Sequence, residues 1–444
     1  MGVGRVRTIV RDLAPYRPGK GAGQAEAEHG ITDAIKLASN ENPYSPPPSV
    51  QKAIQDAAAG VNRYSDHGAV ELRSKLANWL GVDSDCVAVG CGSSGLLQQV
   101  CVAFIDPGDE VVSPWRSFEA YPIFVALTNG KLVAVPLTAD HRIDLDAVAA
   151  AVGPKTKAVM LATPNNPTGL ALSTAEIAEF MGKIPDDVLV VVDEAYREFS
   201  DPAFGDPVED LVGRFPNVVV TRTFSKAYGL AGLRTGYAVA DPSVIEELDK
   251  VLLAFSVNLL AQAGAIAALD ALDEIQVLVD SLLTERARVV DGLRSAGANF
   301  LDPQGNFVWL PLGASTDGVA HALEQRGVVV RPFSGEGIRV TIGTPEENDR
   351  FLATYAEVNA RADGSTEKPI EHVHHVRAEC FSGVATFHHE DHWPAHPGEA
   401  VSKPGEVLRD QLELRDWVID EGVDAKRDND RFRVASLDPL KRRF

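Results

Sequence analysis

The feature that most constrains this chain is a series of short, continuous apolar runs separated by segments with helical spacing. Runs of this length that lack a polar alternation are typical of strands buried on both faces, as in a parallel sheet covered by helices. We therefore predict an α/β fold whose large domain has a mostly parallel sheet sandwiched by helices. The runs are Cys86–Val89, Glu110–Val112, Leu132–Val135, Ala158–Ala162, Val188–Val192 and Asn217–Val220.

Polar groups follow three successive strands of this predicted sheet. Asn166 comes after the first of these strands, Asp193 directly after the second and Lys226 after the third. Ligands of open parallel sheets bind outside the carboxyl ends of the strands, so the three groups can converge although they span 60 residues of sequence. We therefore expect a binding crevice at this edge of the sheet.

Lys226 lies in a hydroxyl-rich turn that leads through a glycine-rich segment to Arg234. A lysine in this setting suits a cofactor that carries both an aldehyde and a phosphate. The amine would form a Schiff base, while the hydroxyls of Thr223 and Ser225 and the Arg234 guanidinium would hold the phosphate. A lone lysine in a turn is more often a solvated surface residue, so the interpretation depends on the other groups of the set.

The chain also contains groups suited to the other parts of such a cofactor. Asp193 follows five apolar residues, and a poorly solvated carboxylate there would pair with a protonated pyridine nitrogen. Ser93 and Ser94 open a predicted helix, whose N–H groups and dipole are suited to a phosphate. The further candidates are Asn166 and Tyr196 for the phenolic oxygen of the cofactor ring and Phe118 for stacking on the ring face.

Over residues 1 to about 362 the chain resembles the fold-type I pyridoxal-phosphate aminotransferases. The resemblance is to the branch that contains the histidinol-phosphate and the aromatic-amino-acid (phenylalanine) aminotransferases. Five segments carry it by their sequence, order and spacing: Leu37–Tyr44, Pro164–Gly169, Asp193–Tyr196, Ser225–Arg234 and Gly337–Gly343.

The resemblance implies pyridoxal 5'-phosphate as the cofactor and assigns catalytic roles. Lys226 is expected to be the Schiff-base lysine and the proton shuttle. Asp193 would pair with the pyridine nitrogen, and Tyr196 with Asn166 would hold the ring oxygen. The resemblance also implies a homodimer in which Tyr64 reaches the cofactor phosphate of the partner subunit.

The resemblance implies an amino acid and a 2-oxo acid as small-molecule substrates, bound by Arg339 through the carboxylate, with Asn42 and Arg331 as further substrate-binding residues. Three segments bear on the choice of donor and resemble the actinobacterial aromatic aminotransferases: Pro114–Ile123, Asn306–Leu310 and Arg331–Gly337. We therefore predict transfer of an amino group from an aromatic amino acid such as phenylalanine to 2-oxoglutarate. Histidinol phosphate is the alternative donor, and a lyase or decarboxylase on the same scaffold would keep the same lysine and aspartate.

The pattern after Tyr237 is mixed and predicts a smaller α+β domain. We expect helices at Ser243–Ala254, Ala261–Ala296 and Asn348–Ala362, and strands at Asn306–Leu310, Val328–Arg331 and Ile338–Ile342. The predicted division is 1–55 for an N-terminal arm and part of the small domain, 56–255 for the large cofactor-binding domain, 256–362 for the small C-terminal domain and 363–444 for a charged, histidine-rich extension of unknown role.

The formal net charge of -21 argues against nucleic acid as a partner. No stretch approaches the roughly 20 apolar residues of a membrane span. The four cysteines form no metal-type pair, and residues 1–20 lack the apolar core of a signal peptide, so we expect reduced thiols and a cytoplasmic protein. The seven histidines after residue 363 have the spacing of no closed zinc site, and we predict no bound metal.

Overall fold

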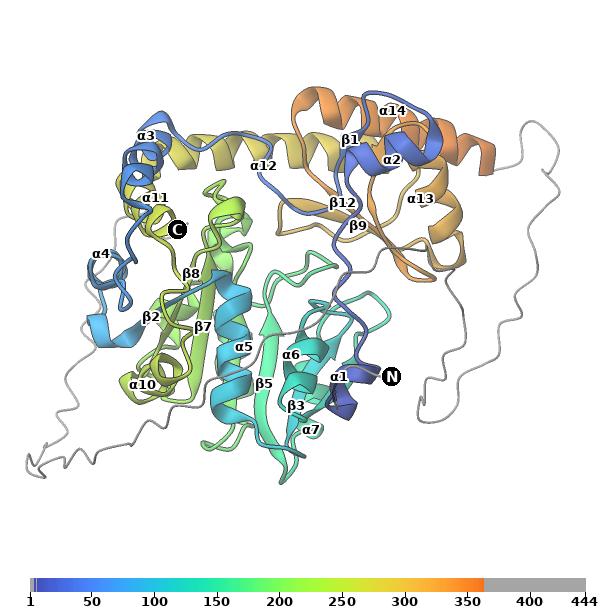
Figure 1. The fold of residues 1–444 in the computed structure, drawn as a ribbon. Helices are drawn as coiled ribbons and strands as arrows, with labels where there is room; N and C mark the ends of the chain where they lie inside the picture. The colour runs from blue at the N-terminus through green and yellow to red at the C-terminus, as the bar shows by residue number, and fades with distance from the viewer. Residues whose placement is uncertain (1–3, 5, 363–444) are drawn as a thin grey trace, which may run out of the picture. The chain divides into compact units, whose positions relative to one another are not determined.

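The computed structural model describes residue 4 and residues 6–362 of the 444-residue chain (Figure 1). The described residues fall within one compact unit, so the division at residues 55 and 255 stays a proposal about how that unit is organised. The histidine-rich segment 363–444, with the predicted absence of a metal there, lies outside the described residues. In the described part of the chain, no helix is both long and apolar enough to cross a membrane.

A seven-stranded sheet forms the centre of the fold, in the order β2-β8-β7-β6-β5-β3-β4. Only β8 runs antiparallel to its neighbours, β2 and β7, so the predicted mostly parallel sheet is confirmed. The strand β8 was not predicted, because its five residues begin with a glycine and form no long apolar run. The strands are β2 (Val87–Gly90), β3 (Glu110–Trp115), β4 (Lys131–Pro136), β5 (Thr156–Ala162), β6 (Leu189–Asp193), β7 (Val218–Thr223) and β8 (Gly236–Ala240).

Both faces of this sheet are buried, as the continuous apolar runs predict. In β6, Val190 and Val192 join one hydrophobic core, while Leu189 and Val191 join the other. Figure 1 shows α5 lying across one face of the sheet, and its leucines belong to the second core. The helices of this half are α4 (Val70–Leu80), α5 (Gly92–Phe104), α6 (Tyr121–Leu127), α7 (Leu145–Ala150), α8 (Thr174–Met181), α9 (Pro207–Asp210) and α10 (Pro242–Lys250).

Two smaller sheets complete the fold, the antiparallel β11-β12-β9 and the parallel pair β1-β10. The expected strand Val328–Arg331 is divided between them. Its first residues pair with Ile35 and Lys36, and its end pairs with β12, a choice made by partners that are distant in sequence. The strands are β1 (Ile35–Lys36), β9 (Phe307–Leu310), β10 (Val328–Val329), β11 (Arg331–Phe333) and β12 (Gly337–Thr341).

The expected helix Ala261–Ala296 is broken at Ala271, whose φ of -108° and ψ of 27° are not helical. Asp273 and Glu274 lie in the first turn of the helix that follows, where acidic side chains favour a new helix start. The helices of this half are α11 (Leu259–Asp270), α12 (Leu272–Ser295), α13 (Thr316–Glu324) and α14 (Pro345–Ala362).

The N-terminal arm is more ordered than its glycine and proline content predicts. It holds two helices that were not expected, α1 (Thr8–Asp12) and α2 (Ala22–His29), before β1 and α3 (Pro48–Ala57). Figure 1 shows α1 beside α6. His29 of α2 lies 3.0 Å from Glu324 of α13, so the arm runs from the large sheet to the smaller sheets. This path carries the arm past the carboxyl ends of β5, β6 and β7.

Candidate active site

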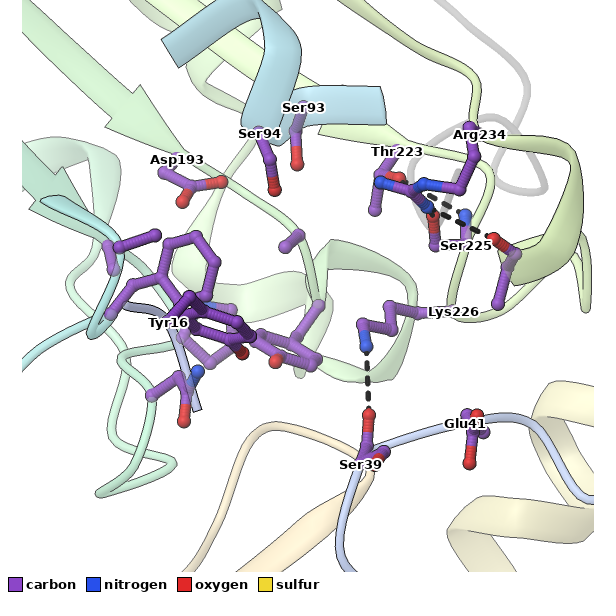
Figure 2. A pocket seen from close by; sticks show the side chains of 18 of the residues that line it. Tyr16, Ser39, Glu41, Ser93, Ser94, Asp193, Thr223, Ser225, Lys226 and Arg234 are labelled. Atoms are coloured by element: carbon purple, nitrogen blue, oxygen red, sulfur yellow. Dashed lines mark hydrogen bonds between the residues drawn. The ribbon is translucent and has the colours of Figure 1, made fainter. Parts of the chain in front are cut away.

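A cavity of about 440 Å³ opens where β5, β6 and β7 end (Figure 2). The three groups that follow these strands, Asn166, Asp193 and Lys226, all line it, so the structure brings them together. Side chains from the start of α5, from the loop after β3 and from the N-terminal arm also line this cavity. The predicted residues that line the cavity are Ser93, Ser94, Phe118, Asn166, Asp193, Tyr196, Thr223, Ser225, Lys226 and Arg234.

Asp193 is the last residue of β6 and is almost completely buried. Its Oδ2 accepts a hydrogen bond of 2.8 Å from the hydroxyl of Tyr121, and its Oδ1 accepts one of 3.3 Å from the hydroxyl of Thr221. Burial raises the pKa of Asp193 to about 6, against the opposing effect of these hydrogen bonds. A cation placed at this carboxylate would therefore be bound strongly.

Lys226 points into the cavity from the turn after β7 (Figure 2). Its Nζ donates to the backbone carbonyl of Ser39 in the arm, at 3.1 Å, and lies 5.7 Å from the centre of the Tyr196 ring. Burial, followed by the charge of Arg339, lowers the pKa of Lys226 to about 7. At neutral pH a large fraction of the amine is therefore unprotonated and able to act as a nucleophile or base.

Ser93, Ser94, Thr223, Ser225 and Arg234 form a hydroxyl–arginine cluster on another wall of the cavity (Figure 2). Arg234 Nη1 donates to the Ser225 hydroxyl at 3.1 Å, and the Thr223 hydroxyl donates to Ser225 Oγ at 2.9 Å. The serines lie at the beginning of the 13-residue helix α5. Gly92 has a φ of +72°, and a Cβ there would stand 2.5 Å from Arg234 Nη2, so only glycine lets the arginine approach this helix start.

Arg339 is buried behind Asn166 rather than on the cavity surface. Its Nη1 donates to Asn166 Oδ1 and its Nη2 to the backbone carbonyl of Ala38, both at 2.6 Å. Its Nε has no hydrogen-bond partner among the described residues, and burial lowers the pKa of Arg339. The Tyr196 hydroxyl accepts from Asn40 Nδ2 at 3.0 Å, so this end of the cavity combines a buried cation with several polar groups.

Besides Arg339, three predicted site residues do not line the cavity. Asn42 donates through Nδ2 to the carbonyl of Ala227, next to the lysine. Arg331 forms an ion pair of 2.7 Å with Glu119. Tyr64 is 82% exposed and its ring stacks on Phe255 at 4.5 Å between centroids.

Sequence reasoning missed Tyr16, Ser39 and Tyr121. Tyr121 lies inside the predicted substrate segment Pro114–Ile123, but nothing local indicates that its hydroxyl faces the carboxylate at the end of β6. Tyr16 is a single aromatic residue in a polar arm, and its ring lies 6.3 Å from that of Phe118. Tyr16 and Phe118 both line the cavity.

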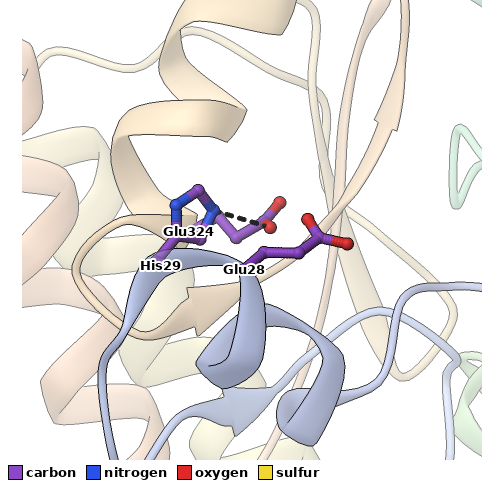
Figure 3. Close-up of side chains that lie close together, drawn as sticks. All are labelled: Glu28, His29 and Glu324. Carbon is purple, nitrogen blue, oxygen red and sulfur yellow. Dashed lines mark hydrogen bonds and ion pairs between the residues drawn. The ribbon is translucent and has the colours of Figure 1, made fainter.

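Among the described residues, Glu28, His29 and Glu324 could offer three metal ligands, within 4.8 Å of one another (Figure 3). The ammonium of Lys20 lies 2.5 Å from a carboxylate oxygen of each glutamate. It already occupies the place of a cation between them, and we propose no metal at this cluster.

Residues 32–354 match the model of the family described as aminotransferase class I and II. The chain is 49% identical over 358 residues to an aromatic amino acid aminotransferase of Rhodococcus opacus, over 81% of this chain and 97% of that protein. It is 48% identical over 354 residues to one of Streptomyces coelicolor, over 80% and 97%. A solved histidinol-phosphate aminotransferase from Sinorhizobium meliloti, in complex with pyridoxal-5'-phosphate, has a TM-score of 0.75 and 32% identity, over 81% and 99%.

Proposed function

The chain belongs to the class I and II aminotransferases, and on that premise we propose that it moves an amino group from an aromatic amino acid to 2-oxoglutarate. Its fold is that of the fold-type I transferases, and its cofactor is pyridoxal 5'-phosphate. The observation that carries the choice of donor is the aromatic wall that Tyr16 and Phe118 form on the cavity of Lys226. The relatives from Rhodococcus and Streptomyces support the same choice.

The residues of the cavity fit this cofactor. Burial raises the pKa of the Asp193 carboxylate, and a buried carboxylate is stabilised by a neighbouring cation. Asp193 would therefore pair with the protonated pyridine nitrogen. The hydroxyl–arginine cluster offers the donors that a phosphate needs, at the start of a helix. Asn166 and Tyr196 would hold the ring oxygen, and Phe118 would lie against the ring.

When bound, pyridoxal 5'-phosphate supplies an aldehyde carbon that bonds to amines and a protonated ring that withdraws electrons from the substrate α-carbon. Lys226 Nζ, with its pKa lowered to about 7, is suited to take the proton from that carbon and to return it. The carbonyl of Ser39 accepts from the same nitrogen and can orient it while it carries the proton. Asp193 would hold a proton on the ring nitrogen of the bound cofactor by pairing with it.

We assign the substrate carboxylate to Arg339. Its guanidinium is buried, its two terminal nitrogens are already oriented by Asn166 and Ala38, and its Nε is unpartnered in the described part of the chain. A carboxylate bound there would satisfy this donor and restore the charge balance of a buried cation. Asn42 and Arg331 do not line the cavity. Asn42 contacts the turn that holds Lys226, and Arg331 contacts the N-terminal arm, so we assign them a role in positioning these segments.

We also propose a homodimer. Tyr64 is exposed and does not line the cavity of its own chain, so its expected contact with the cofactor phosphate requires a second copy. Val61 and Leu253 are 62% and 74% exposed, which supports an apolar interface on this side. In a dimer, Tyr64→Ala should weaken cofactor binding, and sedimentation should report whether the wild-type chain is a dimer.

Cytoplasmic localisation is part of the same proposal. The cysteines of the described residues, Cys86, Cys91 and Cys101, are free thiols, as is usual in reducing compartments. Fractionation of the producing cells would test it, and a periplasmic or secreted pool would contradict it.

The test of the function is a side-by-side measurement of kcat/KM for phenylalanine and for histidinol phosphate with 2-oxoglutarate as acceptor. We expect phenylalanine to be the better donor and phenylpyruvate to accumulate in step with glutamate. A preference for histidinol phosphate would assign the chain to histidine biosynthesis instead. Release of carbon dioxide, or of ammonia without a 2-oxo acid, would identify a decarboxylase or lyase.

A further inference from the structure

We propose that Asn40 is a positioning residue for the site. Its side chain makes the Tyr196 hydroxyl a hydrogen-bond donor toward the cavity, and its backbone holds the Ser39 carbonyl in place as an acceptor for Lys226. The inference rests on the proposed function, because Tyr196 is assigned there to the ring oxygen of the cofactor. Asn40 itself does not line the cavity, so it acts through these neighbours.

Asn40 is a completely buried residue of the N-terminal arm, and each of its polar groups has a hydrogen-bond partner. Its backbone N–H donates to Thr341 Oγ1 at 2.9 Å, and its backbone carbonyl accepts from Asn306 Nδ2 at 3.2 Å. In the side chain, Oδ1 accepts from the Thr341 hydroxyl at 3.0 Å and Nδ2 donates to the Tyr196 hydroxyl at 3.0 Å. The amide is therefore held at both ends, in one orientation.

The direction of these hydrogen bonds follows from the backbone. An N–H group can only donate, so the Thr341 oxygen accepts from the Asn40 backbone and the Thr341 proton goes to Oδ1. With Oδ1 facing Thr341, the NH₂ end of the amide faces Tyr196, and that end is also only a donor. The Tyr196 oxygen therefore accepts, and the tyrosine proton is left for an acceptor in the cavity that this side chain lines.

Tyr196 keeps that proton at neutral pH. Burial raises the pKa of Tyr196, against the opposing effects of the Arg339 charge and of the Asn40 hydrogen bond. A protonated hydroxyl that donates to the ring oxygen of the bound cofactor would stabilise negative charge on that oxygen. The orientation of the Asn40 amide therefore bears on how readily the ring oxygen loses its proton.

The backbone of Asn40 orients a second group. The Ser39 carbonyl and the Asn40 N–H belong to one planar peptide unit and point in opposite directions. Thr341 holds the N–H, and the carbonyl accepts from Lys226 Nζ at 3.1 Å (Figure 2). Asn40 has a φ of +52°, a left-handed conformation that asparagine adopts more readily than most other residues with a side chain. Asparagine thus suits both the backbone and the side-chain contacts of this position.

The experiment follows the visible absorption of the holoenzyme as the pH is changed, and the affinity of the apoprotein for pyridoxal 5'-phosphate. Asn40→Asp keeps the size of the side chain and tolerates the same φ, but it replaces the donor that faces Tyr196 by an acceptor. The tyrosine proton would then turn away from the cofactor, whose ring oxygen would hold its own proton more strongly. We expect the pH of the absorbance change to rise by about one unit and the affinity to fall about tenfold.

A double variant with Tyr196→Phe separates a positioning role from a general effect of charge or packing. Tyr196→Phe alone should also raise the pH of the absorbance change, because it removes the same donor. If Asn40 acts through Tyr196, at least half of the shift caused by Asn40→Asp should disappear in the Tyr196→Phe background. A new buried charge or a packing defect would instead shift the absorbance change equally in both backgrounds.

Threonine variants test the anchor of the amide. Thr341→Val removes the hydroxyl that orients Asn40 and should shift the absorbance change in the same direction, whereas Thr341→Ser keeps the hydroxyl and should restore the wild-type pH. Thr316→Val is the matched control, since it removes a buried hydroxyl that donates to the carbonyl of Gly313, and it should cause no shift. If Asn40→Asp does not fold, Asn40→Gly, which also permits the positive φ, takes its place under the same criteria.

The outcomes distinguish this inference from the proposed function. If Tyr196→Phe shifts the absorbance change but Asn40→Asp does not, or does so equally in both backgrounds, the inference is wrong and the role of Tyr196 stands. If Tyr196→Phe causes no shift, the inference and the assignment of Tyr196 are both overturned, while phenylalanine turnover still decides the proposed reaction. A shift in Asn40→Asp that is largely lost in the Tyr196→Phe background supports both.

Discussion

The hydroxyl of Tyr121 donates a hydrogen bond of 2.8 Å to Oδ2 of Asp193, and both side chains are buried. The second carboxylate oxygen accepts from Thr221. These two hydrogen bonds fix the orientation of the Asp193 carboxylate, which the cofactor ring would contact. Asp193 ends β6, a strand that the sequence pattern predicts. Supporting hydrogen bonds of this kind hold a functional group in its working geometry.

Tyr121→Phe should raise the pKa of Asp193 above its value of about 6, because the lost hydrogen bond favours the ionised form. A neutral carboxyl group cannot pair with a protonated ring nitrogen. We therefore expect cofactor binding to weaken most near pH 6 and to recover as the pH rises, measured by titration of the apoprotein with pyridoxal 5'-phosphate. Tyr355→Phe, at a buried tyrosine in α14, is the control. Identical pH profiles for Tyr121→Phe and the wild type would show that the hydrogen bond has no such role.

Asp193→Asn should stabilise the apoprotein while abolishing turnover. Burial raises the pKa of Asp193 from 3.8 to about 6, so the ionised group destabilises the folded chain above about pH 6 and ceases to do so below 3.8. The gain in free energy of unfolding should be about 2–3 kcal/mol at pH 8 and should shrink as the pH falls through 6. Urea denaturation at several pH values measures it, and a gain that grows toward low pH would contradict the assignment.

Lys226→Ala should lower turnover by at least about 10³-fold, because it removes both the nucleophile and the proton carrier. Formation of phenylpyruvate from phenylalanine measures turnover, and the visible absorbance of the bound cofactor should change as well. Lys52→Ala, at an exposed lysine paired with Asp56 on α3, should behave as wild type. Retained activity in Lys226→Ala would refute the proposed site.

Gly92→Ala should weaken cofactor binding about tenfold or more, because a methyl group at this position would push Arg234 away from Ser225. The positive φ alone costs alanine about 1 kcal/mol of stability. Gly108→Ala is a matched control, since Gly108 has a φ of +93° and no heavy atom within 4 Å of the added Cβ. Both variants should lose similar stability, and only Gly92→Ala should lose affinity for the cofactor in an absorbance titration.

Local sequence was sufficient for six of the seven strands of the large sheet and for the residues at the ends of β5, β6 and β7. The runs before Asp193 and Lys226 are buried on both faces, and such strands need no distant partner to be recognised in the sequence. The expected roles of these residues came from the five segments that resemble the aminotransferase family. Helices α1 and α2 and the break at Ala271 were missed, because weak local preferences there are decided by packing against other elements.

Sequence by itself determined which groups we propose for the site, since Lys226, Asp193 and Arg234 together suit a cofactor with an aldehyde, a ring nitrogen and a phosphate. Only the tertiary structure decided what surrounds them. Arg331 was expected to bind substrate, yet its partner Glu119 lies 212 residues earlier in the chain. Such a pairing leaves no local pattern, because an ion pair depends on where two distant segments are brought together, and that position is set by the packing of the whole chain.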